Sequence, residues 1–144
     1  MPLFLAVALA LLQLSPHPFA GIWTADLARS TQHPGYEFQS VTLEITVAGT
    51  GVTIADKHLY VNGKETSGVH TFQADGVERP FNAPAVGPGL TVMATWNGAR
   101  VLDTVVKKGS KEITRVVYTV SADGRTLTAN RTGLVAQVVV FERK

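Results

Sequence analysis

Apolar and polar residues alternate with a period of two over much of this chain. In the segment Val41–Val47 every odd-numbered residue is apolar and every even-numbered residue is polar. This alternation predicts a β-strand with one buried and one solvated face, because successive side chains of a strand point to opposite sides. No segment after residue 20 keeps apolar residues at helical spacing over three turns, so we expect no long helix.

Turn signals separate the β-rich runs. Asn-Gly or Asp-Gly ends four of them, at residues 62–63, 75–76, 97–98 and 123–124. Both dipeptides favour tight hairpin turns, in which the central residues need positive φ angles. After a first strand that opens at Gly21, the expected strands are residues 41–47, 52–61, 69–74, 90–96, 99–106, 111–120, 125–132 and 134–141. Strands joined by such turns lie side by side and antiparallel.

About eight to ten such strands must form a sandwich or a barrel, since an open sheet would leave an apolar face in water. Sequential hairpins favour an antiparallel up-and-down β-barrel, whose closure removes exposed edges. The last strand is apolar on both faces, so we expect cover on its outer side. Residues 26–39 show no clear strand, and Asp26–Arg29 is expected to form a short helical turn there. Three prolines predict a long loop over Pro80–Gly89.

Length and composition limit the possible functions. The 144 residues suffice for one domain, and 45% of them are apolar, which suits a packed core. The formal charge is +2 and the basic residues are scattered, so we expect no nucleic-acid partner. Lys107, Lys108 and Lys111 are interpreted as a solvated hairpin tip, with an anionic surface or ligand as the alternative. The chain has no cysteine, which excludes disulfides, thiol catalysis and cysteine-based zinc sites.

The N-terminus is typical of an export signal. Residues 3–14 are apolar except for Gln13, and a helix of that length spans about 18 Å, well short of the hydrocarbon core of a bilayer. Met1 and Pro2 supply no positive charge, which departs from the usual signal. We expect residues 1–20 to be a signal peptide and 21–144 to be the barrel domain of a secreted or periplasmic protein without a stable membrane span. A retained membrane anchor and an ordinary core segment are the alternatives.

Several segments resemble a lipocalin-like family of small exported bacterial proteins. Gly21-Ile22-Trp23 matches the Gly-x-Trp signature of lipocalins, and the run from Asp75 to Pro80 is similar to the family's Asp-Gly-x-x-x-Pro. Val120–Thr128 is close to its Val-Ser-x-Asp-Gly-Lys-Thr-Leu-Thr, and Val140–Arg143 resembles its Val-Tyr-Glu-Lys end. Residues 83–97 depart from the family. The resemblance implies a lipocalin-like barrel outside the cytoplasm and carries over no catalytic residues.

The resemblance also implies roles at one end of the barrel. Trp23, which follows Gly21 in the signature, is expected to plug the closed end. An arginine from a late strand packs across this tryptophan in lipocalins, and Arg131 or Arg143 would do so here as a cation–π pair. Direct contact of Trp23 with a ligand is the alternative.

Four aromatic residues are candidates for a ligand cup. Tyr60, Phe72, Trp96 and Tyr118 each lie in or near an expected strand, among apolar residues of the same parity. Aromatic side chains in such places line pockets for apolar ligands, with tyrosine hydroxyls as polar anchors. Ordinary core packing is the alternative for each of them.

No catalytic or metal site is predicted. Asp56 and His58 are two residues apart on one strand, so their side chains share a face and a carboxylate could orient an imidazole for acid–base chemistry. No motif adds a nucleophile, and an exposed polar strand face is the simpler interpretation. His17, His33 and His70 lack the spacing of metal ligands. We therefore expect no enzyme activity and no cofactor.

Two functional hypotheses remain open. The first is an extracytoplasmic, non-catalytic binding protein for a small apolar or amphipathic ligand. The second is a structural or interaction barrel of the cell envelope, with a filled core and no ligand. Neither hypothesis names a protein partner.

Overall fold

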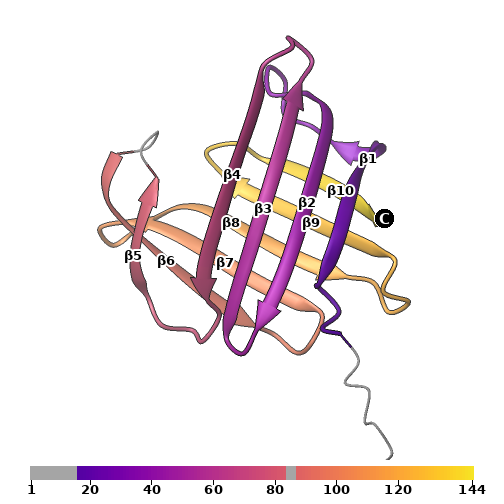
Figure 1. The fold of residues 1–144 in the computed structure, drawn as a ribbon. Coiled ribbons are helices and arrows are strands. Elements are labelled where there is room, and N and C mark those ends of the chain that lie inside the picture. Colours follow the sequence, from indigo (N-terminus) through magenta and orange to yellow (C-terminus); the bar gives the residue numbers. More distant parts are fainter. Residues whose placement is uncertain (1–15, 84–86) are drawn as a thin grey trace, which may run out of the picture.

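The computed structural model describes residues 16–83 and 87–144, and this part of the chain is all-β with no helix. Ten antiparallel strands curl into a half-barrel (Figure 1). The strands are β1 (Gly21–Thr31), β2 (Phe38–Ala48), β3 (Gly51–Tyr60), β4 (Glu65–Gln73), β5 (Arg79–Ala83), β6 (Gly87–Trp96), β7 (Val101–Lys108), β8 (Lys111–Val120), β9 (Thr126–Gly133) and β10 (Gln137–Arg143). The predicted all-β class and strand number are confirmed.

The strands form one sheet in the order β4-β3-β2-β1-β10-β9-β8-β7-β6-β5. Each strand pairs with its neighbours in the sequence, except that β4 does not pair with β5, and β1 also pairs with β10, which places the first and last strands side by side. The predicted up-and-down order is therefore confirmed. β4 and β5 are the two edges of this sheet, so no ladder joins them.

The alternating pattern of β2 determines which face is buried. Val41, Leu43 and Ile45 are 2%, 6% and 1% exposed, while the residues between them point away from the core. Ile45 pairs directly with Ile54 of β3, so the two buried faces continue across the hairpin. The glycines of the four predicted turn dipeptides all have positive φ, as tight turns require.

The expected helical turn at Asp26–Arg29 is wrong, because these residues belong to β1. The pairing of β1 with β10 shifts between Asp26 and Thr31, which marks a bulge. Ser30 stabilises the bulge, since its Oγ donates to the Asp26 carbonyl at 2.7 Å and accepts the Val140 amide at 2.9 Å. Extra residues in a bulge break the period of two, and this hid the strand in the sequence.

The long loop expected over Pro80–Gly89 is also wrong in most of its length. β5 begins at Arg79, and β6 begins at Gly87. Pro80 pairs in register with Thr91 of β6 although it has no amide hydrogen. Proline is tolerated in an edge strand, because the missing donor can face away from the neighbouring strand.

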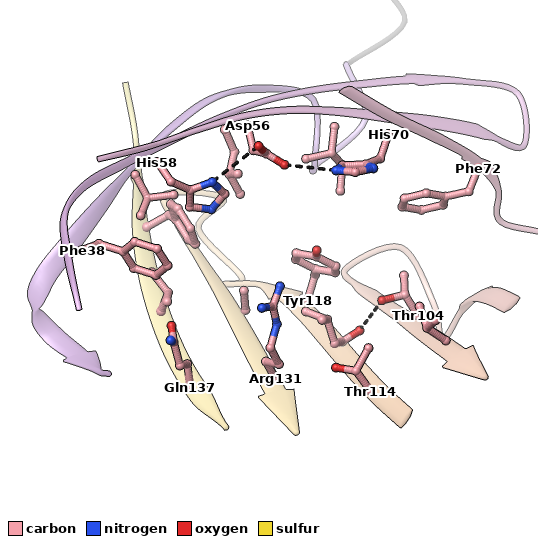
Figure 2. Close-up of a pocket in the computed structure, with 18 of the residues that line it drawn as sticks. Phe38, Asp56, His58, His70, Phe72, Thr104, Thr114, Tyr118, Arg131 and Gln137 are labelled. Carbon is pink, nitrogen blue, oxygen red and sulfur yellow. Dashed lines mark hydrogen bonds and ion pairs between the residues drawn. The ribbon is translucent and has the colours of Figure 1, made fainter. Parts of the chain in front are cut away.

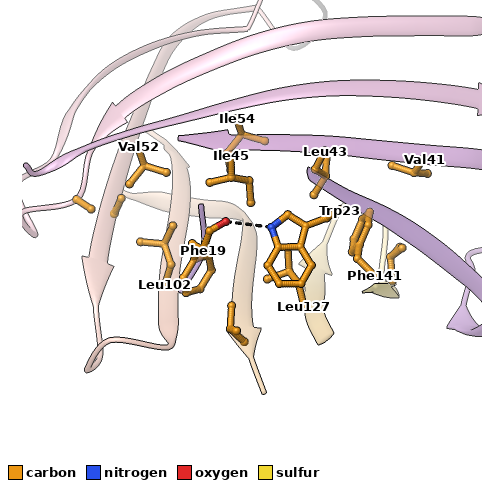
Figure 3. Packing of buried hydrophobic residues seen from close by; sticks show 14 residues of the cluster. Phe19, Trp23, Val41, Leu43, Ile45, Val52, Ile54, Leu102, Leu127 and Phe141 are labelled. Atoms are coloured by element: carbon orange, nitrogen blue, oxygen red, sulfur yellow. Dashed lines mark hydrogen bonds between the residues drawn. The ribbon is translucent and has the colours of Figure 1, made fainter. Parts of the chain in front are cut away.

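The apolar core fills one end of the barrel (Figure 3). Its largest fully buried side chains come from segments spread along the whole chain: Trp23, Phe19, Ile45, Leu102, Leu127, Val52 and Val120. Each such side chain contributes roughly 1.5–3 kcal/mol through burial alone. We refer to this packed end as the closed end.

Part of the expected signal peptide contributes to this core. Residues 1–15, which contain its apolar run, lie outside the described residues. Phe19 is 1% exposed, and its carbonyl accepts a hydrogen bond from Trp23 Nε1 at 3.0 Å. The folded domain in the structure therefore begins before Gly21.

Candidate functional site

A cavity of about 340 Å³ lies inside the barrel, above the packed end. Most of its wall is apolar and comes from strands on both sides of the barrel: Phe38, Val41, Leu43, Ile54, Phe72, Phe81, Val92, Val106, Val116, Ala129, Val139 and Phe141. This volume is at the lower end of the roughly 300–1,000 Å³ of typical small-molecule sites. An apolar wall with few polar groups favours an apolar or amphipathic occupant.

Three polar side chains form a cluster on the wall made by β3 and β4 (Figure 2). Asp56 lies between two imidazoles: its Oδ1 is 3.5 Å from His58 Nδ1, and its Oδ2 is 3.4 Å from His70 Nε2. Gly68 stands opposite Asp56 in the β3–β4 ladder. The absence of a side chain at Gly68 leaves room for the carboxylate and the His70 ring, both of which lie within 4 Å of an added Cβ.

Arg131 and Tyr118 lie on the wall that faces this cluster (Figure 2). Arg131 makes none of the ion pairs found in the described part of the chain. Burial raises the pKa of the Tyr118 hydroxyl, while the nearby charge of Arg131 lowers it and that of Asp56 raises it. Burial has the largest effect, so the hydroxyl stays protonated at neutral pH and is available as a hydrogen-bond donor.

Three of the four aromatic candidates line the cavity. Tyr60, Phe72 and Tyr118 point into it from β3, β4 and β8. Trp96 does not line it: its ring packs against Phe19 at 5.0 Å between ring centroids, at the closed end. Trp96 lies at the end of β6, and the N-terminal segment covers it there, which the pattern of β6 alone did not indicate.

Only one of the two candidate arginines packs against Trp23. The guanidinium carbon of Arg143 lies 4.2 Å from the centroid of the Trp23 ring. Arg131 instead lines the cavity, and it is an exposed residue of β9. Gly21 has φ +137°, and a Cβ there would lie 2.5 Å from Arg143 Nη1, so the missing side chain makes room for the guanidinium.

Sequence reasoning missed several cavity residues. His70 has the same parity on β4 as Phe72, which is a signal that would have placed it on the inner face. Phe81 lies in the segment expected to be a loop, and Phe38 lies where no strand was expected. Asp56 and His58 share a face as predicted, but that face lines the cavity and is not an exposed surface.

Two further findings concern the described residues only. No three histidine, aspartate or glutamate side chains among them are arranged to hold a metal ion. None of their segments forms a helix of the length and hydropathy needed to cross a bilayer.

Solved structures of lipid-binding barrels resemble this fold. The Schistosoma mansoni fatty acid binding protein in complex with arachidonic acid matches with a TM-score of 0.63 at 19% identity, covering 91% of this chain and 99% of the other. The fatty acid-binding protein of Drosophila melanogaster brain tissue matches with a TM-score of 0.61 at 21% identity, covering 86% and 98%. Zebrafish ileal bile acid-binding protein complexed with cholic acid matches with a TM-score of 0.58 at 16% identity, covering 88% and 98%.

No protein-family model matches this sequence, and a search of curated protein sequences finds no significant match. At these low identities the structural matches establish the fold alone, which is a lipocalin-like antiparallel β-barrel.

Proposed function

We propose that this protein is a non-catalytic carrier that binds a small amphipathic molecule inside the barrel, outside the cytoplasm. The observation that carries the proposal is the largely apolar cavity of about 340 Å³, lined also by Arg131, which makes no ion pair with any described residue. The similar solved structures support it, because they are structures of fatty acid and bile acid binding proteins.

The polar groups of the cavity favour an acidic head group. Arg131 offers a charge and several N–H donors, and Tyr118 offers a hydroxyl on the same wall. A carboxylate held by a guanidinium forms charge-assisted hydrogen bonds, which are stronger than neutral ones. The apolar remainder of the ligand would lie against the aromatic and aliphatic wall.

Export to the periplasm or the exterior is the second part of the proposal. It is supported by the apolar run of residues 3–14, which has the length of the apolar region of a signal peptide. Mass spectrometry of the protein from periplasmic and cytoplasmic fractions tests it. Recovery of the full-length chain in the cytoplasm would argue against export.

Ligand binding is tested by titrating the purified protein with a fluorescent fatty acid and displacing the probe with unlabelled stearic acid. We expect saturable binding at one site, and Arg131→Leu should weaken it about tenfold or more, because a hydrogen bond to a charged group contributes about 1.5–3 kcal/mol. Arg100→Leu is the matched control, since Arg100 is exposed in a turn at the closed end. Native mass spectrometry would reveal a co-purified ligand.

If the protein binds no fatty acid, no bile acid and no component of a lipid extract, the carrier function is contradicted. A barrel with a structural or interaction role would then be the better interpretation. If Arg131→Leu and Arg100→Leu weaken binding equally, the head group does not bind at Arg131.

A further inference from the structure

Asp56 is an unusual feature of a cavity proposed to hold the apolar body of an acidic amphipathic molecule. Its side chain is 17% exposed and points from β3 into the cavity, between His58 and His70 (Figure 2). It is the only carboxylate among the described residues that line this cavity. The wall opposite holds Arg131, which is the position proposed above for an acidic head group.

The two imidazoles leave part of the carboxylate unsatisfied. An ionised carboxylate has about four acceptor positions, and each neighbouring imidazole can occupy one of them at most. Both contacts are long, at 3.5 Å and 3.4 Å, so neither is a tight hydrogen bond. Because Asp56 lines the cavity, its remaining acceptor positions are available to a molecule bound there.

A plain hydrocarbon chain fits poorly against such a group. It would displace water from the carboxylate and supply no donor, and a buried polar group without a partner destabilises the complex. A second acidic group at this place would also be repelled by the charge of Asp56. A ligand with a hydroxyl or ammonium group beside Asp56 would instead replace the lost water contact with a charge-assisted hydrogen bond.

We propose that the ligand carries a hydrogen-bond donor, a hydroxyl or an ammonium group, on its apolar body in addition to its acidic head group, and that Asp56 accepts this donor. Asp56 then determines specificity, and His58 and His70 position its carboxylate. The inference rests on the proposed carrier function and narrows its ligand to acidic amphiphiles with a second polar group.

The test compares matched ligands on the full protein. The ligands differ only in the hydrogen-bond donor on the chain: stearic acid, a mid-chain hydroxystearic acid and a mid-chain aminostearic acid. Isothermal titration calorimetry measures the dissociation constant of each. We expect at least one donor-bearing ligand to bind about tenfold or more tightly than stearic acid, in line with a hydrogen bond to a charged acceptor.

Two variants then connect this preference to Asp56. Asp56→Leu should remove the preference and tighten the binding of stearic acid, because it replaces the unsatisfied carboxylate with an apolar group. Asp56→Asn has nearly the same shape and keeps a carbonyl acceptor, so it should retain folding and reduce the preference. Glu44→Gln is the control for loss of a carboxylate, since Glu44 is exposed on the outer face of β2. Circular dichroism establishes that each variant is folded.

The outcomes separate this inference from the proposed function. Equal binding of all three ligands to the native protein, or a preference that survives in both Asp56 variants, overturns the inference while the carrier function stands. If none of the three ligands binds and no bile acid binds, the carrier function is contradicted, and the inference fails with it.

Discussion

Arg143 connects three parts of the chain that are far apart in the sequence. Its guanidinium lies over the ring of Trp23, which is fully buried. Its Nη1 and Nη2 donate to the carbonyls of Ala20 and Pro18 at 2.6 and 2.7 Å, and its Nε donates to the Gly124 carbonyl at 2.9 Å. One side chain therefore joins β10 to the N-terminal segment and to the turn between β8 and β9.

Replacement of this arginine should weaken the closed end. We expect Arg143→Leu to lower the free energy of unfolding by about 2 kcal/mol, because a cation–π contact and three hydrogen bonds are lost. Urea denaturation followed by tryptophan fluorescence measures the change. Lys144→Leu is the neighbouring control and should change the stability by less than about 0.5 kcal/mol. Equal effects of both substitutions would show that the guanidinium contacts contribute nothing specific.

The segment from His17 to Ala20 acts as a short structural element, although it is neither helix nor strand. Phe19 fills the space between Trp23 and the β6 residue Trp96, and the His17 ring lies 4.7 Å from that of Trp96. The Ala20 amide donates to the His17 carbonyl at 2.9 Å, which closes a turn. The element therefore covers the closed end, where a barrel made of strands alone would expose its core.

This role has a consequence for processing of the chain. A protein that begins at Gly21 should be less stable than one that begins at Pro16 by about 3 kcal/mol or more, since it loses the buried ring of Phe19. Denaturant unfolding of the two chains measures the difference, and Phe19→Ala in the longer chain should reproduce most of it. If the apolar N-terminus is removed during export, we expect the mature protein to retain His17. Equal stabilities, or a mature N-terminus at Gly21, would contradict this role.

The molecule as a whole is a sheet closed at β1 and β10 but not between β4 and β5. A second hollow of about 320 Å³ lies along this gap and shares His70, Phe72, Phe81 and Val92 with the main cavity. The rings of His70 and Phe81 approach across it, with centroids 6.3 Å apart. Side chains therefore bridge the gap where backbone hydrogen bonds do not.

The unpaired edges should be visible in hydrogen exchange. About half of the amides of β4 and β5 face the gap, and we expect them to exchange faster than the amides of β2 and β9, which have neighbours on both sides. Exchange measured by NMR resolves individual amides. Protection of the gap-facing amides equal to that of β9 would mean that the two edges are paired in solution.

Much of the fold follows from local patterns. The alternation in Val41–Val47 identified a buried face, and glycine-containing dipeptides placed four of the turns, because side-chain direction and turn geometry depend on a few adjacent residues. The same parity argument placed Tyr60, Phe72 and Tyr118 on inner faces. It failed at Asp26–Arg29, where a bulge interrupts the period, and at β5, where Pro80 in an edge strand resembles a loop residue.

The contents of the site depended on pairing between distant segments. Asp56 meets His70 because β3 pairs with β4 in a register that puts Gly68 opposite the carboxylate, and a shift of one residue would turn each side chain to the other face. Which of Arg131 and Arg143 covers Trp23, and whether Trp96 lines the cavity or the closed end, depend on the same registers and on where residues 17–20 pack. Strands and turns are local properties of this chain, whereas the cavity exists only through the curvature and register of the complete sheet.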